Sequence, residues 1–255
     1  MEILLRPWGG MHYAVQGAED GPTVVFVNSL GTDLRVWDAL VPLLPKGLRL
    51  LRFDKRGHGL SELGPAEGIV GFADDAIALL EAEARGPVVM VGLSIGGLIA
   101  QEVAARHPLA GLVLSNTAAR LGTAEGWTAR IDAIREGGMA QIADGVMDRW
   151  FSPAFTARSP WRRMMECTDS EGYIAACRAL AEADLTERTR GLRLPALVIA
   201  GDADGASPPG VVEAAADLIP GAAFHLIPSG HLPPVEAPEA MAAILNPFLQ
   251  RCLHV

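Results

Sequence analysis

The sequence has little of what several classes of protein require. It contains three cysteines, Cys167, Cys177 and Cys252, without metal-like spacing, which favours reduced thiols over a disulfide framework. It has no excess of basic residues: the formal net charge is −9 and the pI is about 5.1, which argues against nucleic acid and anionic membranes as partners. No apolar run approaches the roughly 20 residues that span a bilayer, so we expect no membrane-spanning helix.

The N-terminus has no basic segment followed by a long apolar one, so we expect no signal peptide and a cytoplasmic protein. Internal repeats and low-complexity tracts are also missing. The chain has 255 residues, of which 50% are hydrophobic, and this allows one large domain with a sizeable core, or one domain with an insertion.

Short apolar runs and helical patterns alternate along most of the chain. A hairpin is expected from strands at 2–7 and 11–16, with its turn at Gly9-Gly10, and buried strands at 23–27, 48–53, 88–91, 109–114, 195–200 and 222–227. Helices are expected at 36–44, 72–84, 97–107, 211–218 and 238–249. This alternation predicts an α/β fold with a mostly parallel, eight-stranded sheet that is covered by helices on both faces.

The pattern of apolar residues changes between residues 119 and 190. Strand-like runs disappear there, and helical periodicity with interspersed tryptophans and arginines replaces them. We interpret 119–190 as a helical cap inserted into a core made of 1–118 and 191–255. Ligands bind at the carboxyl edge of open α/β sheets, so a cap inserted after a strand would enclose a substrate pocket.

The motif Gly92-Leu93-Ser94-Ile95-Gly96 follows the apolar run Val88–Val91 and opens a helical segment. G-x-S-x-G between a strand and a helix is the nucleophile elbow of α/β-hydrolases, so the sequence predicts the α/β-hydrolase fold. Ser94 is the expected nucleophile. The tight turn would hold its hydroxyl beside a helix N-terminus, where backbone N–H groups and the helix dipole favour developing negative charge.

A nucleophilic serine needs a base that is oriented by a carboxylate, and in this fold the chain order is serine, acid, histidine. His231 lies in a Gly- and Pro-flanked loop after the last expected strand, and we predict it to be the base. His107 lies at the far end of the helix that Ser94 begins, His225 lies within a strand, and His254 lies in the C-terminal tail.

Two aspartates follow the preceding strand, and both remain candidates for the carboxylate. We favour Asp204, which stands further out in the turn, over Asp202, although either aspartate could instead accept backbone N–H groups of the turn. The oxyanion donors are expected to be the N–H of Ile95, directly after the nucleophile, and the N–H of Leu30, in the loop after the third strand.

The loop Asp54–Ser61 holds a further group of polar residues, Asp54, Arg56 and His58. A strand-end aspartate and an arginine in a glycine-rich loop more often tie such a loop to its neighbours than take part in chemistry. We interpret these three residues as structural.

Several segments together resemble the 3-oxoadipate enol-lactonases, over nearly the whole chain. They are 28–33, Trp37-Asp38, 56–59, 92–97, 114–119, 127–133, 137–139 and 150–155, and those within the cap are the most specific. The triad pattern of that family falls on Ser94, Asp204 and His231. The sequence departs from the family at 205–207, where Gly-Ala-Ser replaces the more frequent Pro-Ala-Thr, and at 67–71.

The resemblance implies that the enzyme opens a small anionic lactone through an acyl-enzyme and needs no metal or organic cofactor. The free carboxylate of such a substrate calls for a cation in the pocket, and we expect Arg130 in that role, with Trp127 and Trp150 as walls. The alternative is a solvated helix arginine and two core tryptophans.

Two other functions remain open. One is a general short-chain esterase or cofactor-free perhydrolase, which would turn over neutral aryl esters as efficiently as the lactone. The other is a non-catalytic ligand receptor with the same fold, and such a receptor would not react with a fluorophosphonate probe.

Overall fold

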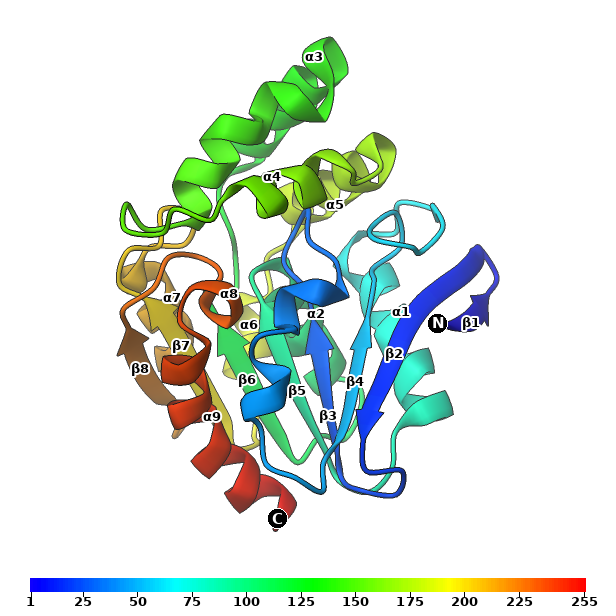
Figure 1. Cartoon of the computed structure of the whole chain (residues 1–255), viewed down its shortest axis with the longest axis vertical. Helices are drawn as coiled ribbons and strands as arrows, with labels where there is room; N and C mark the ends of the chain where they lie inside the picture. Colours follow the sequence, from blue (N-terminus) through cyan, green and yellow to red (C-terminus); the bar gives the residue numbers. More distant parts are fainter.

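The computed structural model describes residues 1–255, and one eight-stranded sheet runs through it (Figure 1). The strands are β1 (Glu2–Arg6), β2 (Gly9–Gly17), β3 (Thr23–Val27), β4 (Arg49–Phe53), β5 (Val88–Leu93), β6 (Gly111–Ser115), β7 (Ala196–Gly201) and β8 (Ala223–Ile227). Their order is β1-β2-β4-β3-β5-β6-β7-β8. Only the β1–β2 and β2–β4 pairs are antiparallel, which confirms the predicted mostly parallel sheet.

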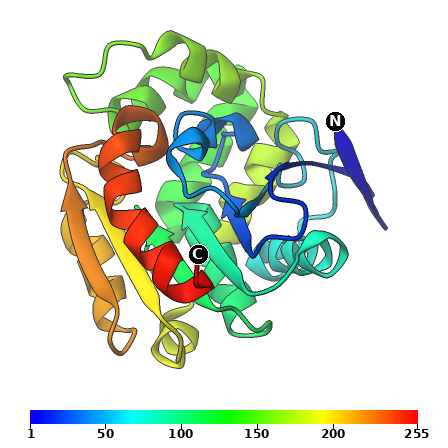
Figure 2. The same ribbon diagram turned by 60° about the horizontal axis from the view of Figure 1, so that its bottom comes forward.

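Helices cover both faces of the sheet. The core helices are α1 (Gly68–Glu83), α2 (Ile95–Ala104), α7 (Pro209–Asp217), α8 (Pro233–Glu236) and α9 (Pro238–Leu253). Helices α1 and α2 pack against each other, and both α2 and α9 contact the central strand β5. Figure 2 shows α9 in red in front of the sheet, with α1 in cyan on its other side. None of the helices is both long and apolar enough to cross a membrane.

Two local predictions were wrong. The segment 36–44 forms two short 3-10 helices, η1 (Leu34–Trp37) and η2 (Val41–Leu43), rather than one α-helix. Pro42 lies within this segment, and it has no N–H to donate to the carbonyl of Asp38, as an α-helix would require. In the hairpin, Arg6 pairs with Gly9, so the turn is at Pro7-Trp8 and both glycines belong to β2.

Four helices lie between β6 and β7: α3 (Ala124–Trp150), α4 (Ser159–Glu166), α5 (Ser170–Glu182) and α6 (Thr186–Arg190). Helices α3, α4 and α5 lie beyond the carboxyl ends of the parallel strands (Figure 1). Helix α6 packs on α2 instead, where Arg188 pairs with Glu102 at 2.8 Å. The division into core and cap at 119–190 stays a prediction.

Helix α3 is two helical segments joined at a kink. Gly138 has a φ of 70° and a ψ of −173°, a backbone conformation that residues other than glycine rarely adopt. The two segments therefore meet at an angle, and the second one ends at Trp150.

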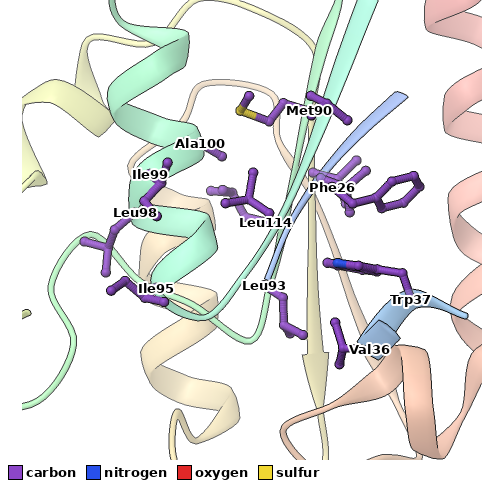
Figure 3. Close-up of a cluster of buried hydrophobic side chains, with 14 of the residues drawn as sticks. Phe26, Val36, Trp37, Met90, Leu93, Ile95, Leu98, Ile99, Ala100 and Leu114 are labelled. Atoms are coloured by element: carbon purple, nitrogen blue, oxygen red, sulfur yellow. The ribbon is translucent and has the colours of Figure 1, made fainter. Parts of the chain in front are cut away.

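Apolar side chains from both faces of the sheet form one continuous core. Figure 3 shows Leu98 and Ile99 of α2 on one side of the strands, and Phe26 with Trp37 on the other. The rings of Phe26 and Trp37 lie 4.9 Å apart. The Trp37 indole N–H donates to Oδ1 of Asn28 at 2.7 Å, so this core contact also fixes the loop that follows β3.

Leu114, at the centre of this cluster, has no exposed surface. We expect Leu114→Ala to lower the free energy of unfolding by about 2–5 kcal/mol, since it removes buried methyl groups and leaves a cavity. Urea denaturation measures the change. Leu226→Ala is the matched control, because Leu226 is 52% exposed, and its expected effect is below about 0.5 kcal/mol. Equal losses in both variants would contradict the assignment of the core.

Candidate active site

Ser94 occupies a strained turn between β5 and α2. Its φ is 58° and its ψ is −122°, which a residue with a side chain adopts only when its surroundings impose it. The surroundings are tight: a Cβ at Gly96 would overlap the carbonyl oxygen of Val27. The carbonyl of Ser94 accepts from the Thr117 hydroxyl at 2.7 Å and from the Gly97 N–H at 2.8 Å. The fold thus builds the elbow that the motif predicts.

His231 and Asp204 meet on neighbouring loops, after β8 and β7. His231 Nδ1 lies 2.8 Å from Asp204 Oδ2, and the two residues are 2% and 5% exposed. The backbone N–H of His231 donates to the carbonyl of Trp150 at 2.7 Å. Ser94 and His231 line the same cavity, of about 200 Å³. The structure therefore brings together all three residues that were predicted from the sequence as a triad.

Hydrogen-bond donors surround the Asp204 carboxylate. Oδ1 accepts from the N–H groups of Ala206 at 2.7 Å and Ser207 at 2.9 Å. Oδ2 accepts from Asn116 Nδ2 at 2.7 Å and from the Ser207 hydroxyl at 2.8 Å. Burial alone would raise the pKa of Asp204, but the adjacent His231, the Ser207 N–H and the Asn116 amide lower it below its ordinary value. Asp204 is held as an anion that can orient His231 and stabilise its protonated form.

The other candidates for acid and base lie elsewhere. Asp202 is exposed and accepts the N–H of Ser229 at 3.1 Å, so its carboxylate ties two loops together. Asp204, not Asp202, contacts His231. None of the remaining downstream histidines lines the cavity: His107, His225 and His254.

The two expected oxyanion donors are free to act. Leu30 lines the cavity beside Ser94, and its N–H makes no hydrogen bond within the chain. Ile95 is the first residue of α2, where an N–H has no acceptor within the helix. Asn28 holds the Leu30 loop in place, because its Nδ2 donates to the carbonyl of Phe53 at 2.8 Å.

Asn116 and Ser207 were not predicted as parts of the site. Asn116 follows β6 directly and has a φ of 49°, and its amide contacts Asp204 and the carbonyl of Gly230. The Ser207 hydroxyl oxygen lies within hydrogen-bond distance of three acceptors: Asp204 Oδ2, the Asn116 carbonyl at 2.7 Å and His231 Nδ1 at 3.2 Å. The signal for Asn116 is its position, since a polar residue at the carboxyl end of a central strand lies at the ligand edge of the sheet.

The residues expected to bind substrate also face the cavity. Arg130, Trp127 and Trp150 all line it. The Arg130 guanidinium lies 5.0 Å from the centre of the Trp127 ring, and its Nη1 lies 3.4 Å from the Tyr173 hydroxyl. Arg130 is therefore held over an aromatic face at the cavity wall rather than extended into solvent.

A second arginine, Arg149, lines the same cavity and was missed in the sequence. Its carbonyl accepts the N–H of Gly205, next to the triad aspartate, at 3.2 Å. Burial lowers the pKa of Arg149, and the nearby charge of Arg130 lowers it further. The cavity lining contains no aspartate or glutamate. The cavity thus has two positive charges without a partner, an arrangement suited to a carboxylate.

The polar loop after β4 has structural contacts. Asp54 accepts from His12 Nδ1 at 2.8 Å and from the Leu34 N–H at 2.7 Å. Arg56 pairs with Asp75 at 2.7 Å. These contacts tie the loop to its neighbours, as interpreted from the sequence.

The chain is similar to known proteins along nearly its whole length. The model of the Alpha/beta hydrolase family matches residues 24–244. The chain is 32% identical over 245 residues to 3-oxoadipate enol-lactonase 1 of Acinetobacter baylyi, with 92% of this chain and 91% of the relative covered. The enol-lactonase from Burkholderia xenovorans LB400 superposes with a TM-score of 0.89 at 36% identity, covering 94% of this chain and 96% of that one.

An esterase is among the similar structures as well. A thermophilic esterase from Thermogutta terrifontis, solved with malate bound, superposes with a TM-score of 0.89 at 29% identity, covering 99% of this chain and 100% of that one. Fold, motif and relatives agree on a hydrolase. The chain belongs to the α/β-hydrolase family, and within it the chain is similar to the 3-oxoadipate enol-lactonases.

Proposed function

We propose that this enzyme opens 3-oxoadipate enol-lactone to 3-oxoadipate through an acyl-enzyme, in the cytoplasm, as a step of aromatic catabolism in the β-ketoadipate pathway. One observation carries the proposal: a single cavity holds Ser94 and His231 together with two arginines and no acidic residue. The first two residues supply the chemistry of ester cleavage, and the arginines suit a substrate with a free carboxylate. The names of the similar enol-lactonases support the same substrate.

In the first half of the reaction, the Ser94 hydroxyl attacks the lactone carbonyl while His231 accepts its proton. Asp204 holds the imidazole by Nδ1 and stabilises the positive charge that forms on it. The carbonyl oxygen becomes an oxyanion, which the N–H groups of Leu30 and Ile95 bind. Collapse of this intermediate breaks the ring C–O bond.

The leaving group stays attached to the acyl chain, because the ester is cyclic. It departs as an enol oxygen, which is more easily expelled than an ordinary alkoxide, and it tautomerises to a ketone that is a poor nucleophile for closing the ring again. Water then attacks the acyl-enzyme, with His231 as the base, and 3-oxoadipate leaves. His231 gives the proton taken from Ser94 to the departing enol oxygen, and it later gives the proton taken from water back to Ser94, so that one histidine serves both halves of the reaction.

Arg130 and Arg149 would bind the free carboxylate of the substrate. Charge-assisted hydrogen bonds from a guanidinium to a carboxylate are about twice as strong as neutral ones. Trp127 and Trp150 would pack on the flat lactone ring. A substrate held at its carboxylate presents its carbonyl to Ser94 in one orientation.

The arginine prediction compares two lactones with the same ring. α-Angelica lactone carries a neutral methyl group where 3-oxoadipate enol-lactone carries a carboxymethyl group. We expect Arg149→Met to lower kcat/KM for the anionic lactone by about 10- to 100-fold, the effect of losing one hydrogen bond to a charged group, and for α-angelica lactone by less than about threefold. Loss of ultraviolet absorbance follows both reactions.

Arg120→Met is the matched control, since Arg120 is exposed and lies outside the cavity. It should leave both lactones unaffected. Arg130→Met should resemble Arg149→Met. If each pocket variant lowered kcat/KM for both lactones equally, the arginines would have a structural role and the proposed carboxylate site would be wrong.

A general carboxylesterase is the second candidate, favoured by the similarity to the Thermogutta terrifontis esterase. Such an enzyme would hydrolyse p-nitrophenyl acetate with a kcat/KM equal to that for the enol-lactone. The unpaired arginines favour the lactone, because a neutral aryl ester offers them no charge. Lack of reaction with a fluorophosphonate probe would contradict both candidates and indicate a binding protein.

A further inference from the structure

Lys55 is a buried lysine that contacts the loop carrying Leu30. The chain has only two lysines, and Lys55, which follows β4, is 1% exposed. Its ammonium group donates to two backbone carbonyls, those of Asn28 at 3.1 Å and Ser29 at 2.9 Å. It makes no ion pair: Asp54 beside it pairs with His12, and Asp33 pairs with Arg35. Burying a charged group costs free energy unless an opposite charge pairs with it, and here only carbonyl oxygens accept the ammonium group.

The Ser29 carbonyl is an unusual acceptor. Besides Lys55, it accepts from the Thr32 hydroxyl at 3.0 Å and from the Thr32 N–H at 3.3 Å. A carbonyl oxygen has two lone pairs, so three donors, one of them charged, polarise it strongly. The same peptide unit carries the N–H of Leu30. That N–H has no acceptor within the chain, and Leu30 lines the cavity beside Ser94.

We propose that Lys55 is a positioning residue for the oxyanion hole: its ammonium group holds the Ser29–Leu30 peptide with the N–H directed at the substrate and polarises that N–H as a donor. The inference rests on the proposed nucleophilic role of Ser94. Lys55 contacts neither substrate nor reacting atoms. It acts through one peptide bond, whose N–H becomes a stronger donor when its carbonyl binds a cation.

The charge on Lys55 responds to pH in the physiological range. Burial lowers the pKa of Lys55 to about 7, although the carboxylates of Asp54 and Asp33 act in the opposite direction. The other titratable group that faces it is His58, whose pKa burial and the Lys55 charge lower well below its ordinary value. His58 in turn stacks on Tyr173. With His58 neutral, a pKa of about 7 makes the charge of Lys55 itself sensitive to pH in this range.

The sign of the pH dependence follows. Lys55 carries its charge below its pKa and loses it as the pH rises through that value. The Leu30 N–H is then a weaker donor, so kcat should fall on the alkaline side. The wild-type enzyme should therefore lose kcat as the pH rises through the pKa of Lys55.

The first test removes the charge. Lys55→Met should lower kcat at pH 6.5 by about 10- to 100-fold, with KM changed by less than about twofold, because only the transition state carries the oxyanion. Lys55→Gln, which keeps an N–H donor without charge, should lie between wild type and Lys55→Met. In both variants the alkaline decline of kcat should vanish. A purely structural role would leave that decline in place.

Two controls separate charge from packing. Lys46→Met removes the only other lysine, which is exposed, and should leave kcat and its pH profile unchanged. Thr32→Val removes the neutral hydroxyl donor from the same carbonyl. It should lower kcat by less than about tenfold, and it should retain the alkaline decline.

The second test needs no substitution at Lys55. With two lysines in the chain, ¹³C-labelled lysine should give two side-chain NMR signals, one of which titrates near pH 7. Propylboronic acid forms an anionic tetrahedral adduct with a nucleophilic serine, which mimics the oxyanion. Its addition should move the Lys55 titration to higher pH, because the anion favours the charged amine. Ser94→Ala should abolish this movement.

The outcomes distinguish the two proposals. Activity on p-nitrophenyl acetate but not on the enol-lactone would refute the proposed substrate, and the Lys55 tests would proceed with the ester. If folded Lys55→Met kept kcat within twofold of wild type, or if the boronate left the Lys55 titration in place, the role of Lys55 would be refuted while Ser94 chemistry stood.

Discussion

Ser94→Ala should lower kcat for opening of the enol-lactone by about 10⁵-fold or more, as removal of the nucleophile does in serine hydrolases. Alanine keeps the Cβ and lacks only the hydroxyl, so the elbow should persist with its backbone angles. His231, Asp204 and both oxyanion donors would remain. The variant should still bind the product 3-oxoadipate, because the arginines at the cavity wall are untouched.

The decay of lactone absorbance measures this effect, with Ser170→Ala as the matched control. Ser170 is exposed at the start of α5, outside the cavity, and its loss should leave the rate unchanged. Urea denaturation of Ser94→Ala should show a stability close to that of wild type. Equal lactone decay with wild type and Ser94→Ala would refute the acyl-enzyme mechanism.

Asp204→Asn should lower kcat by about 10⁴-fold, the loss known for the same substitution in another serine hydrolase triad. An asparagine amide offers His231 Nδ1 a donor or a neutral oxygen in place of a carboxylate. The imidazole would then adopt the wrong tautomer or lose the stabilisation of its protonated form. The Asn116 amide, which donates to Oδ2 in the wild type, would favour the oxygen of the new side chain at its own position.

Asp202→Asn is the matched control, two residues away on the same loop. Its carboxylate accepts only a backbone N–H and is exposed, so the expected change in kcat is less than about threefold. A reversed result, with Asp202→Asn inactive and Asp204→Asn active, would show that the assignment of the carboxylate is wrong.

The strands could be predicted because their signal is local. Five- and six-residue apolar runs such as Thr23–Val27 and Val88–Leu93 are buried on both faces of a parallel sheet. The elbow was equally local, since one pentapeptide contains the serine and its small neighbours. The segment 36–44 was wrongly predicted as one α-helix because its apolar spacing suits a helix. The spacing does not show that Pro42 lacks the N–H that an α-helical hydrogen bond would need.

The parts of the site that were missed depend on contacts between distant segments. Asn116 meets Asp204 across 88 positions of sequence, and Lys55 meets Ser29 across 26. Arg149 is one of many arginines in the helical insertion, and only the tertiary structure shows that it faces the cavity. Lys55 lies between Asp54 and Arg56, two residues correctly interpreted as structural, and nothing in its own position distinguishes it from them.

Two backbone hydrogen bonds join the end of α3 to the loops that carry the acid and the base. The carbonyl of Trp150 holds the backbone of His231, and the carbonyl of Arg149 holds Gly205, beside Asp204. A displacement of this end of α3 would therefore disturb both loops that carry the acid and the base. Residues 139–150 therefore belong to the framework of the acid and the base, and the kink at Gly138 separates them from the first half of α3, which contacts α5 through Arg130 and Tyr173. The end of α3 thus serves both as a wall of the cavity and as a support for the loops that carry Asp204 and His231.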